Sequence, residues 1–360
     1  MKLAHQCVRP EESFEYLFKE PPRPGAVTEI VPGVGWLRMP LPFALDHINL
    51  WVLADGDGWT LVDCGLATDT TRELWAQLLA GPLADREPGR LIVTHCHPDH
   101  IGLAAWLCKK FQLQPWMTKS EYLHAHAVYH RIAGTGYDAL RPWCQRNGLD
   151  EERLRALHAR EDHYRRGVPE LPESFRRIKH GESLTIDGNA WRVIVGYGHS
   201  PEHAALYCER LGVVIAGDML LPRISTNVSV WPSEPDSDPV GEFLASLAFF
   251  DDLPDDTRVL PSHGVPFRGI APRVAELRRH HQTRLDKLAA LCGQPRTAAQ
   301  ILPELFQRKL DEHQIIFALG ETIAHLNYLM HRGVLECVNA EGVQRFVRRA
   351  TPAGASAVIS

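Results

Sequence analysis

The order of apolar and polar residues along this chain predicts two groups of strands, each followed by helices. Short apolar runs of the first group, bounded by turns rich in glycine and aspartate, lie at about 28–31, 34–39, 47–54 and 59–63. A helix is expected over about 68–80, with Thr68 or Asp69 as its N-cap, and then another strand over 91–93. A second set of strands begins at about 184.

Two strand-rich halves that each end in helices predict an α+β fold. Each layer must bury its apolar face against another layer, so the two sheets pack together and helices cover their outer faces. The expected architecture is a four-layer αββα sandwich. The predicted segments are a Pro-rich lead-in over 1–26, the sandwich over 27–290 and a small separate domain over 294–350.

The strand expected at 91–93 is followed at once by side chains that can bind a metal: His95, His97, Asp99 and His100. A chain that turns out of its sheet at Thr94 lets these groups converge on one point, which neither a regular helix nor a regular strand allows. Residues 101–107 then indicate the start of a helix. The cluster is therefore expected in a strand-to-helix loop, where proteins commonly carry their functional residues.

Three later apolar segments also lead to a histidine or an aspartate, namely His199, Asp218 and His263. A single histidine is more often a hydrogen-bonded core or surface residue than a ligand, and this chain has 19 histidines. Chance clustering does not explain why four strand ends carry such residues in this order. We therefore predict one metal site built from all seven side chains.

The His-x-His-x-Asp-His run, with His, Asp and His after it, resembles the ligand pattern of the metallo-beta-lactamase superfamily over about residues 27–270. The resemblance implies the same αββα sandwich, here a metallo-beta-lactamase sandwich, with a dinuclear metal site. It assigns one metal to His95, His97 and His199, the second metal to Asp99, His100 and His263, and a bridging position to Asp218.

The resemblance also makes Asp63 the aspartate that orients the ligands, a role that any carboxylate beside metal-bound imidazoles is expected to have. Imidazoles with a few carboxylates favour two Zn ions, with Fe and Mn as the alternatives. Two ions roughly 3.5–4 Å apart would activate a shared water as a bridging hydroxide. Asp99 is the expected catalytic residue, because it would bind metal and also help a proton reach the leaving group.

The predicted function is metal-dependent hydrolysis of a small ester or thioester, with an acyl-coenzyme A or glutathione thioester as the leading substrate. The Asp99-His100 pair is similar to the glyoxalase II and nuclease branches of the family, so a phosphodiesterase or endoribonuclease with the same metals is the alternative. A third hypothesis makes the chain a ligand-sensing regulator with structural metals. Structural zinc sites are normally closed by four protein ligands, which argues against this third hypothesis.

Residues 120–170 form a mostly helical insertion between the first ligands and His199. The insertion holds 8 Arg and 8 acidic residues, so it is not a basic patch. From its position we expect a lid over the site. Its aromatic residues would supply a wall for the substrate: Tyr122, Tyr129, Tyr137 and Trp143.

The segment from about Gln294 predicts two helices, one capped by Thr297 and one over 317–329, followed by a hairpin around 339–342. This order is similar to a winged-helix domain. Residues 295–360 carry 7 basic and 6 acidic side chains, and residues 317–331 include no Lys or Arg. A nucleic-acid reader needs a face that neutralises phosphates, so we expect packing against the sandwich or a second copy, as in a homodimer.

Composition agrees with a soluble enzyme that acts on a small molecule. The chain is 44% apolar and 23% charged, with a formal net charge of −5, which predicts no general attraction to nucleic acid. It contains no apolar run long enough to span a membrane, and its first residues lack the apolar region of a signal peptide. Its 8 Cys are scattered without a Cys-x-x-Cys pair. We therefore expect a cytoplasmic protein without a membrane partner.

Overall fold

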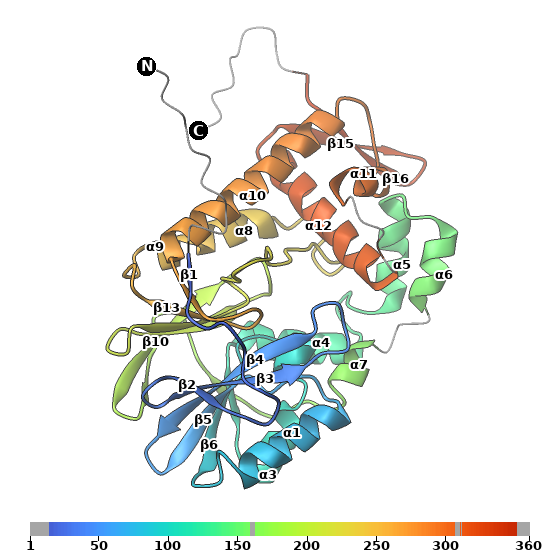
Figure 1. The fold of residues 1–360 in the computed structure, drawn as a ribbon. Helices are drawn as coiled ribbons and strands as arrows, with labels where there is room; N and C mark the ends of the chain where they lie inside the picture. Colours follow the sequence, from blue (N-terminus) through green and yellow to red (C-terminus); the bar gives the residue numbers. More distant parts are fainter. Residues whose placement is uncertain (1–13, 159–162, 307–309, 311, 351–360) are drawn as a thin grey trace, which may run out of the picture. The chain divides into compact units, whose positions relative to one another are not determined.

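The computed structural model describes residues 14–158, 163–306, 310 and 312–350, and the chain divides into two compact units. The first unit contains both large sheets (Figure 1). Its described residues are 14–130, 163–226 and 242–278. The described residues of the second unit are 131–158, 227–241, 279–306, 310 and 312–350.

One sheet of the first unit is formed by the N-terminal strands. In spatial order its seven strands are β2 (Thr28–Val31), β3 (Val34–Pro40), β4 (His47–Asp55), β5 (Gly58–Val62), β6 (Glu87–Ile92), β7 (Pro115–Met117) and β8 (Arg176–Arg177). Neighbouring strands are antiparallel from β2 to β5 and parallel from β5 to β8. The strands predicted at 28–31, 34–39, 47–54 and 59–63 are thus present with nearly the expected bounds.

The other sheet is formed mainly by the later strands. In spatial order these are β1 (Glu15–Tyr16), β14 (Phe267–Arg268), β13 (Arg258–Pro261), β12 (Val213–Gly217), β11 (His203–Cys208), β10 (Asn189–Gly196) and β9 (Ser183–Ile186). Only β12 and β13 pair in parallel among these strands. The segment expected as a separate lead-in thus contributes β1 to a sheet edge, because its backbone pairs with β14; residues 1–13 lie outside the described part of the chain.

The strands are apolar on both faces because each sheet lies between two other layers. In β4, Trp51 and Leu53 belong to the core between the sheets, whereas Leu50 and Val52 belong to the core under the helices. Trp51 is paired in register with Trp36 of β3, and their stacked rings lie 6.2 Å apart. This double burial confirms the sandwich that the strand pattern predicted.

Helices of the first unit complete its layers. They are α1 (Asp69–Ala80), α2 (Pro98–Ile101), α3 (Ala104–Phe111), α4 (Lys119–His130), α7 (His163–Gly167) and α9 (Ala248–Asp251). Helices α1 and α3 cover the sheet that contains β3 and β6 (Figure 1). The predicted cap of α1 is correct, since the Thr68 side chain accepts a hydrogen bond from the backbone N–H of Thr71.

The second unit is built from the C-terminal segment together with part of the insertion. Its elements are α5 (Tyr137–Arg146), α6 (Glu151–His158), α11 (Ala298–Leu305), α12 (Glu312–His331), β15 (Leu335–Ala340) and β16 (Val343–Arg348). Two further helices, α8 (Pro239–Ser246) and α10 (Ile270–Leu291), are divided between the units. The two helices and the hairpin expected after residue 294 are present, and Thr297 caps α11 through a capping box with Gln300.

The insertion predicted as a lid over 120–170 is divided between the two units, and its role as a lid stays a prediction. Helices α4 and α7 belong to the first unit, whereas α5 and α6 belong to the second. The reason is apolar packing: Trp143 of α5 is only 2% exposed, and α5 contacts both α6 and β16. Within the described residues, no helix is long and apolar enough to cross a membrane.

Candidate metal centre

The seven side chains predicted as ligands lie together in the first unit. They form two groups whose ligand atoms lie within 4.8 Å of one another: His95, His97, His199 and Asp218 in the first group, and Asp99, His100 and His263 in the second. Each side chain follows the carboxyl end of a strand, namely β6, β10, β12 or β13. Because β12 and β13 are parallel and adjacent, their following residues Asp218 and His263 reach the same edge of the sheet.

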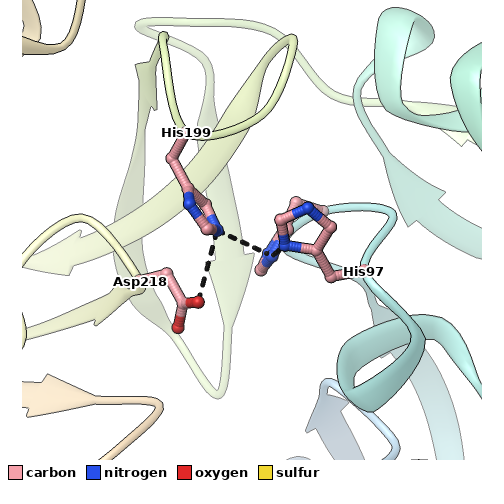
Figure 2. Close-up of side chains that lie close together, drawn as sticks. His97, His199 and Asp218 are labelled. Atoms are coloured by element: carbon pink, nitrogen blue, oxygen red, sulfur yellow. Dashed lines mark hydrogen bonds and ion pairs between the residues drawn. The ribbon is translucent and has the colours of Figure 1, made fainter. Parts of the chain in front are cut away.

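The first group is tightly packed. His95 Nε2 lies 2.8 Å from His97 Nδ1 and 3.2 Å from His199 Nε2. His199 Nε2 lies 3.3 Å from Asp218 Oδ2. Figure 2 shows the imidazole of His199 between the Asp218 carboxylate and the loop that carries His97. Four donor atoms from three loops therefore face one small volume.

The second group shares the Asp218 carboxylate. Its other oxygen, Oδ1, lies 3.5 Å from His263 Nε2 and 3.7 Å from His100 Nε2. Asp99 Oδ2 lies 3.5 Å from His263 Nε2 and 3.8 Å from His100 Nε2. Asp218 thus directs one oxygen to each group, which is the geometry of a bridging carboxylate.

The donor atoms of the second group fit a cation. Among the described residues, two buried atoms at this point have no hydrogen-bond partner, His100 Nε2 and Asp218 Oδ1. Ligand atoms bound tetrahedrally about 2.0–2.1 Å from Zn lie about 3.4 Å apart, close to the spacing of these donors. Buried polar atoms without a partner are rare because they lose hydration without compensation, and a bound cation would supply that compensation.

Hydrogen bonds on the far side of the rings fix which nitrogen faces the centre. His100 Nδ1 donates to Asp63 Oδ2 at 2.8 Å, and His263 Nδ1 donates to the backbone oxygen of His47 at 2.8 Å. His95 Nδ1 lies 3.1 Å from the hydroxyl of Thr94. With Nδ1 engaged in this way, the neutral form of each ring carries on Nε2 the lone pair that a metal needs.

The carboxylate of Asp63 connects Thr94 to the ring of His100. Its Oδ1 accepts the backbone N–H of Thr94 at 2.8 Å, and its Oδ2 accepts the Thr94 hydroxyl at 2.8 Å as well as His100 Nδ1–H. The backbone φ of Asp63 is +62°, a left-handed conformation that is costly for most residues and is often retained at functional sites. The structure places Asp63 where the orienting role predicts it.

Burial and charge act differently on the two groups. Burial, assisted by the neighbouring imidazoles, holds the pKa of His95 and of His97 well below the usual value. Burial also opposes a charge on His100, but the carboxylates of Asp63, Asp99 and Asp218 raise its pKa to about 10. A cation in the second group would therefore have to displace a proton from His100.

The Asp218 carboxylate is held in its charged form. Burial would raise its pKa, but His263, His100 and His199 around it lower the pKa well below the usual value. Asp99 has the most exposed side chain of the carboxylates and imidazoles paired at the centre, at 20%, whereas that of Asp218 is 10% exposed. Asp99 is thus the carboxylate of the site that water reaches most easily.

Three polar residues at the site were not predicted from the sequence. His203 Nε2 accepts the backbone N–H of Asp218 at 3.0 Å, and burial lowers the pKa of His203 to about 3, so the ring stays neutral. His47 Nε2 accepts the backbone N–H of Gly264 beside His263. Glu121 of α4 accepts hydrogen bonds from two ligand loops. His203 lies only four residues after His199, so its nearness to a predicted ligand could have marked it as part of the site. His47 and Glu121 lie in segments without a motif.

The four aromatic residues predicted as a substrate wall are divided between the two units. Tyr122 and Tyr129 lie in the first unit, where their hydroxyls donate to the backbone oxygens of Pro172 and Pro169. Tyr137 and Trp143 lie in the second unit, where the Tyr137 hydroxyl donates to the oxygen of Leu154. Each of the three hydroxyl contacts lies within one unit, and the shared substrate wall stays a prediction.

Comparison with known families matches two parts of the chain. Residues 44–263 match the family described as the metallo-beta-lactamase superfamily, and residues 285–349 match the family described as the metallo-beta-lactamase-like, C-terminal domain. A probable metallo-hydrolase, YqjP, of Bacillus subtilis (strain 168) is 26% identical over 302 residues, which are 81% of this chain and 91% of that protein.

Two solved structures are similar over nearly their whole length. A beta-lactamase domain protein from Burkholderia ambifaria is 44% identical with a TM-score of 0.88, covering 94% of this chain and 99% of that one. A metallo-beta-lactamase family protein from Thermus thermophilus is 30% identical with a TM-score of 0.76, covering 89% of this chain and 100% of that one. Both likenesses extend beyond the sandwich, since they cover most of the 360 residues.

Proposed function

The chain belongs to the metallo-beta-lactamase superfamily, whose members include metal-dependent hydrolases, and we propose that it is a dinuclear hydrolase of a small ester or thioester. The observation that carries this proposal is the division of Asp218 between the two groups of donors, with Oδ2 near His199 and Oδ1 near His100 and His263. A carboxylate with one oxygen for each of two cations is what a two-metal site requires.

Two divalent cations, Zn first by the donor set, would polarise the substrate carbonyl and lower the pKa of a water held between them. His95, His97 and His199 would hold one ion with Asp218, and Asp99, His100 and His263 would hold the other. Asp63 and the backbone oxygen of His47 keep the rings of His100 and His263 in the tautomer that presents Nε2.

Asp99 is the residue we assign to proton transfer. Its carboxylate lies beside His263 and is the most exposed of the paired acids at the centre, so a substrate and a water can both reach it. A carboxylate at that position accepts a proton from the attacking water and returns it to the leaving group. A thiolate is a good leaving group that needs little protonation, which is compatible with a single carboxylate acting as the shuttle.

The charge of the chain favours a carbonyl substrate over a nucleic acid. Residues 295–360 hold 7 basic and 6 acidic side chains, and the whole chain has a net charge of −5. Binding of RNA or DNA draws most of its affinity from Lys and Arg that neutralise several phosphates. This charge balance supports an ester or thioester as the substrate and a role for the C-terminal domain other than gripping nucleic acid.

A substrate panel tests the proposal. Purified protein loaded with Zn is assayed on acyl-coenzyme A thioesters, a glutathione thioester and simple esters, and in parallel on single-stranded RNA at matched low and moderate salt. We expect thioester or ester cleavage that is lost on chelation and restored by added metal. The Asp218→Asn variant is the matched inactive control, because Asn keeps the shape of the side chain and loses its charge.

Two results would count against the proposal. Active protein that retains less than about one metal ion per chain would exclude the two-metal site. RNA cleavage with steep salt dependence and no cleavage of esters or thioesters would put the phosphodiesterase in first place.

A further inference from the structure

Glu121 is a buried carboxylate that none of the metal-binding roles uses. It lies in the first turn of α4, and its side chain is fully buried at 0% exposure. A buried carboxylate is costly unless hydrogen bonds compensate for its lost hydration.

Three hydrogen bonds supply that compensation. Glu121 Oε2 accepts the backbone N–H of Cys96 at 2.9 Å. Glu121 Oε1 accepts the hydroxyl of Ser200 at 2.6 Å and the backbone N–H of Glu202 at 2.7 Å. Hydrogen bonds to an ionised acceptor are about twice as strong as neutral ones.

The donors belong to the two loops that carry the imidazoles of the first group. Cys96 lies between His95 and His97 in the loop after β6, and Ser200 follows His199 in the loop after β10. These loops extend from different sheets of the sandwich. One carboxylate therefore ties together two backbone segments, beside the hydrogen bond that the backbone N–H of Ala204 donates to the oxygen of Thr94 at 2.9 Å.

Helix α4 and the residue before it, Thr118, are fixed to the same loops by further contacts. The hydroxyl of Thr118 donates to the backbone oxygen of Glu202 at 2.8 Å, and the backbone N–H of Ser120 donates to the Glu202 carboxylate at 3.0 Å. From the other side, the hydroxyl of Tyr164 in α7 donates to the backbone oxygen of Cys96 at 2.9 Å. Glu121 is thus held on a rigid support, which a positioning role requires.

We propose that Glu121 is a positioning residue for the first metal group: it sets the spacing of the His95/His97 loop and the His199 loop so that their imidazoles converge on one cation. The inference rests on the proposed function, because it presumes that the group binds metal. Glu121 does not touch the ligand atoms, so its effect passes through the backbone of the two loops. The second group, whose rings are fixed by Asp63 and the oxygen of His47, does not depend on it.

The Glu121→Gln variant removes the hydrogen bonds to one of the two loops and keeps those to the other. A glutamine has one oxygen and one NH₂ group, so it can accept from the Ser200 and Glu202 donors or from Cys96, but not from both. In the other loop, a backbone N–H then faces the NH₂ group of the glutamine. Two donors repel each other, so that loop must move. Loss of such an outer contact typically weakens metal binding about 10–100-fold.

The experiment measures the affinity of each group separately by Co²⁺ titration against a competing chelator. The His263→Ala background lacks a ligand of the second group, so it reports on the first group. The His199→Ala background reports on the second group. We expect E121Q to weaken binding about 10–100-fold in the His263→Ala background, with an altered Co²⁺ absorption spectrum, and to leave binding unchanged in the His199→Ala background.

Two controls complete the design. Glu321→Gln removes another buried carboxylate of the chain, one paired with Arg284 in the second unit, and should leave Co²⁺ affinity unchanged. If E121Q does not fold, Ser200→Ala removes a single donor from the same carboxylate and should weaken the first group by a smaller factor.

The outcomes distinguish this inference from the function on which it rests. Folded E121Q, or S200A in its place, that binds Co²⁺ in the first group with wild-type affinity and spectrum would overturn the role of Glu121. Equal weakening of both groups would overturn it too, since a general loss of structure would then explain the effect. Wild-type protein that binds no metal would instead overturn the proposed function.

Discussion

At the scale of single residues, the centre depends on which atom of each side chain is already engaged. His100 and His263 donate Nδ1–H to Asp63 and to the His47 oxygen, so that Nε2 faces the volume between the groups. Asp218 is held charged by the surrounding imidazoles, which lower its pKa against the effect of burial. The lone pairs of these side chains are therefore directed at two points. Asp218 is the one residue that faces both points, so metal binding at each point depends on it.

Removing that shared member gives the clearest prediction at this scale. Asp218→Ala should abolish turnover and reduce bound metal well below the expected content of about two ions per chain, because both groups lose a ligand. Metal analysis of dialysed protein measures the content. His130→Ala is the matched control, since His130 is an exposed histidine of α4 outside both groups, and its metal content should equal that of the wild type. Full metal content in folded D218A would show that Asp218 is not a ligand.

The position before Asp218 requires glycine. Gly217 has a φ of +55°, and a Cβ atom there would lie 2.3 Å from the ring of His203. The ring cannot give way easily, because His203 is fully buried and its Nε2 accepts the N–H of Asp218. Gly217 is thus required for His203 to support the backbone that presents the bridging carboxylate.

At the scale of elements, the insertion between the first and third ligand segments has two parts with different tasks. Helix α4 carries Glu121, and α7 carries Tyr164, so both contact the ligand loops. Helices α5 and α6 instead pack within the second unit, where the N–H of Ala299 donates to the oxygen of Asn147 and Trp143 is buried. Deletion of the whole insertion over 120–170 would therefore remove parts of both units.

A substitution in α5 tests this division. Trp143→Ala should lower the free energy of unfolding by about 3–5 kcal/mol, because it removes a large buried side chain and leaves a cavity. It should not change metal content, since α5 lies in the unit that holds none of the predicted ligands. Urea unfolding followed by circular dichroism, with metal analysis of the same preparation, measures both quantities. Loss of metal from folded W143A would show that α5 supports the centre after all.

At the scale of the whole molecule, both units bury histidines that resist protonation. Burial lowers the pKa of His203 in the first unit to about 3. In the second unit, burial lowers the pKa of His281 to about 2 and that of His325 to about 4. His281 and His325 share a hydrogen bond of 3.0 Å, and His325 Nδ1 donates to the oxygen of Glu321. A proton on His325 Nε2 would remove the acceptor of this hydrogen bond.

These shifts predict that metal-free protein loses stability in mild acid. Below pH about 6.5 these histidines bind protons in the unfolded chain but stay neutral in the folded chain. Each such histidine therefore lowers the free energy of unfolding by about 1.4 kcal/mol per pH unit, down to its folded pKa. His100 acts in the opposite sense: its raised pKa contributes stability that is fully present below about 6.5 and is lost only as the pH rises towards about 10. The free energy of unfolding should therefore fall between pH about 6.5 and about 4, since more histidines have a lowered pKa than a raised one.

Urea midpoints of chelator-treated protein at pH about 7.5 and about 5 measure this loss. The His281→Asn variant lacks one of the buried groups and should lose less stability between the two pH values than the wild type. Equal midpoints at both pH values in the wild-type protein would contradict the burial of these rings as neutral groups.

Much of the fold and of the centre followed from the order of residues along the chain. Apolar runs that alternate with turns predicted the strands of both sheets, and a histidine or aspartate just after a strand predicted seven side chains that the structure brings together. Such features are local, because a strand and the residue that follows it are neighbours in the sequence. Parallel strands then carry their carboxyl ends to one edge, so local order was enough to place Asp218 and His263 together.

Contacts between distant segments could only be found in the tertiary structure. Glu121 meets Cys96 and Ser200 across 25 and 79 residues of sequence, and nothing in the pattern around it marks it as more than a polar residue of a helix. Trp143 resembled a substrate contact because it lies in sequence between two ligand segments, yet apolar packing buries it in the other unit. Residue order specifies which groups are available; the free energy of burying apolar surface and pairing buried polar atoms decides which of them meet.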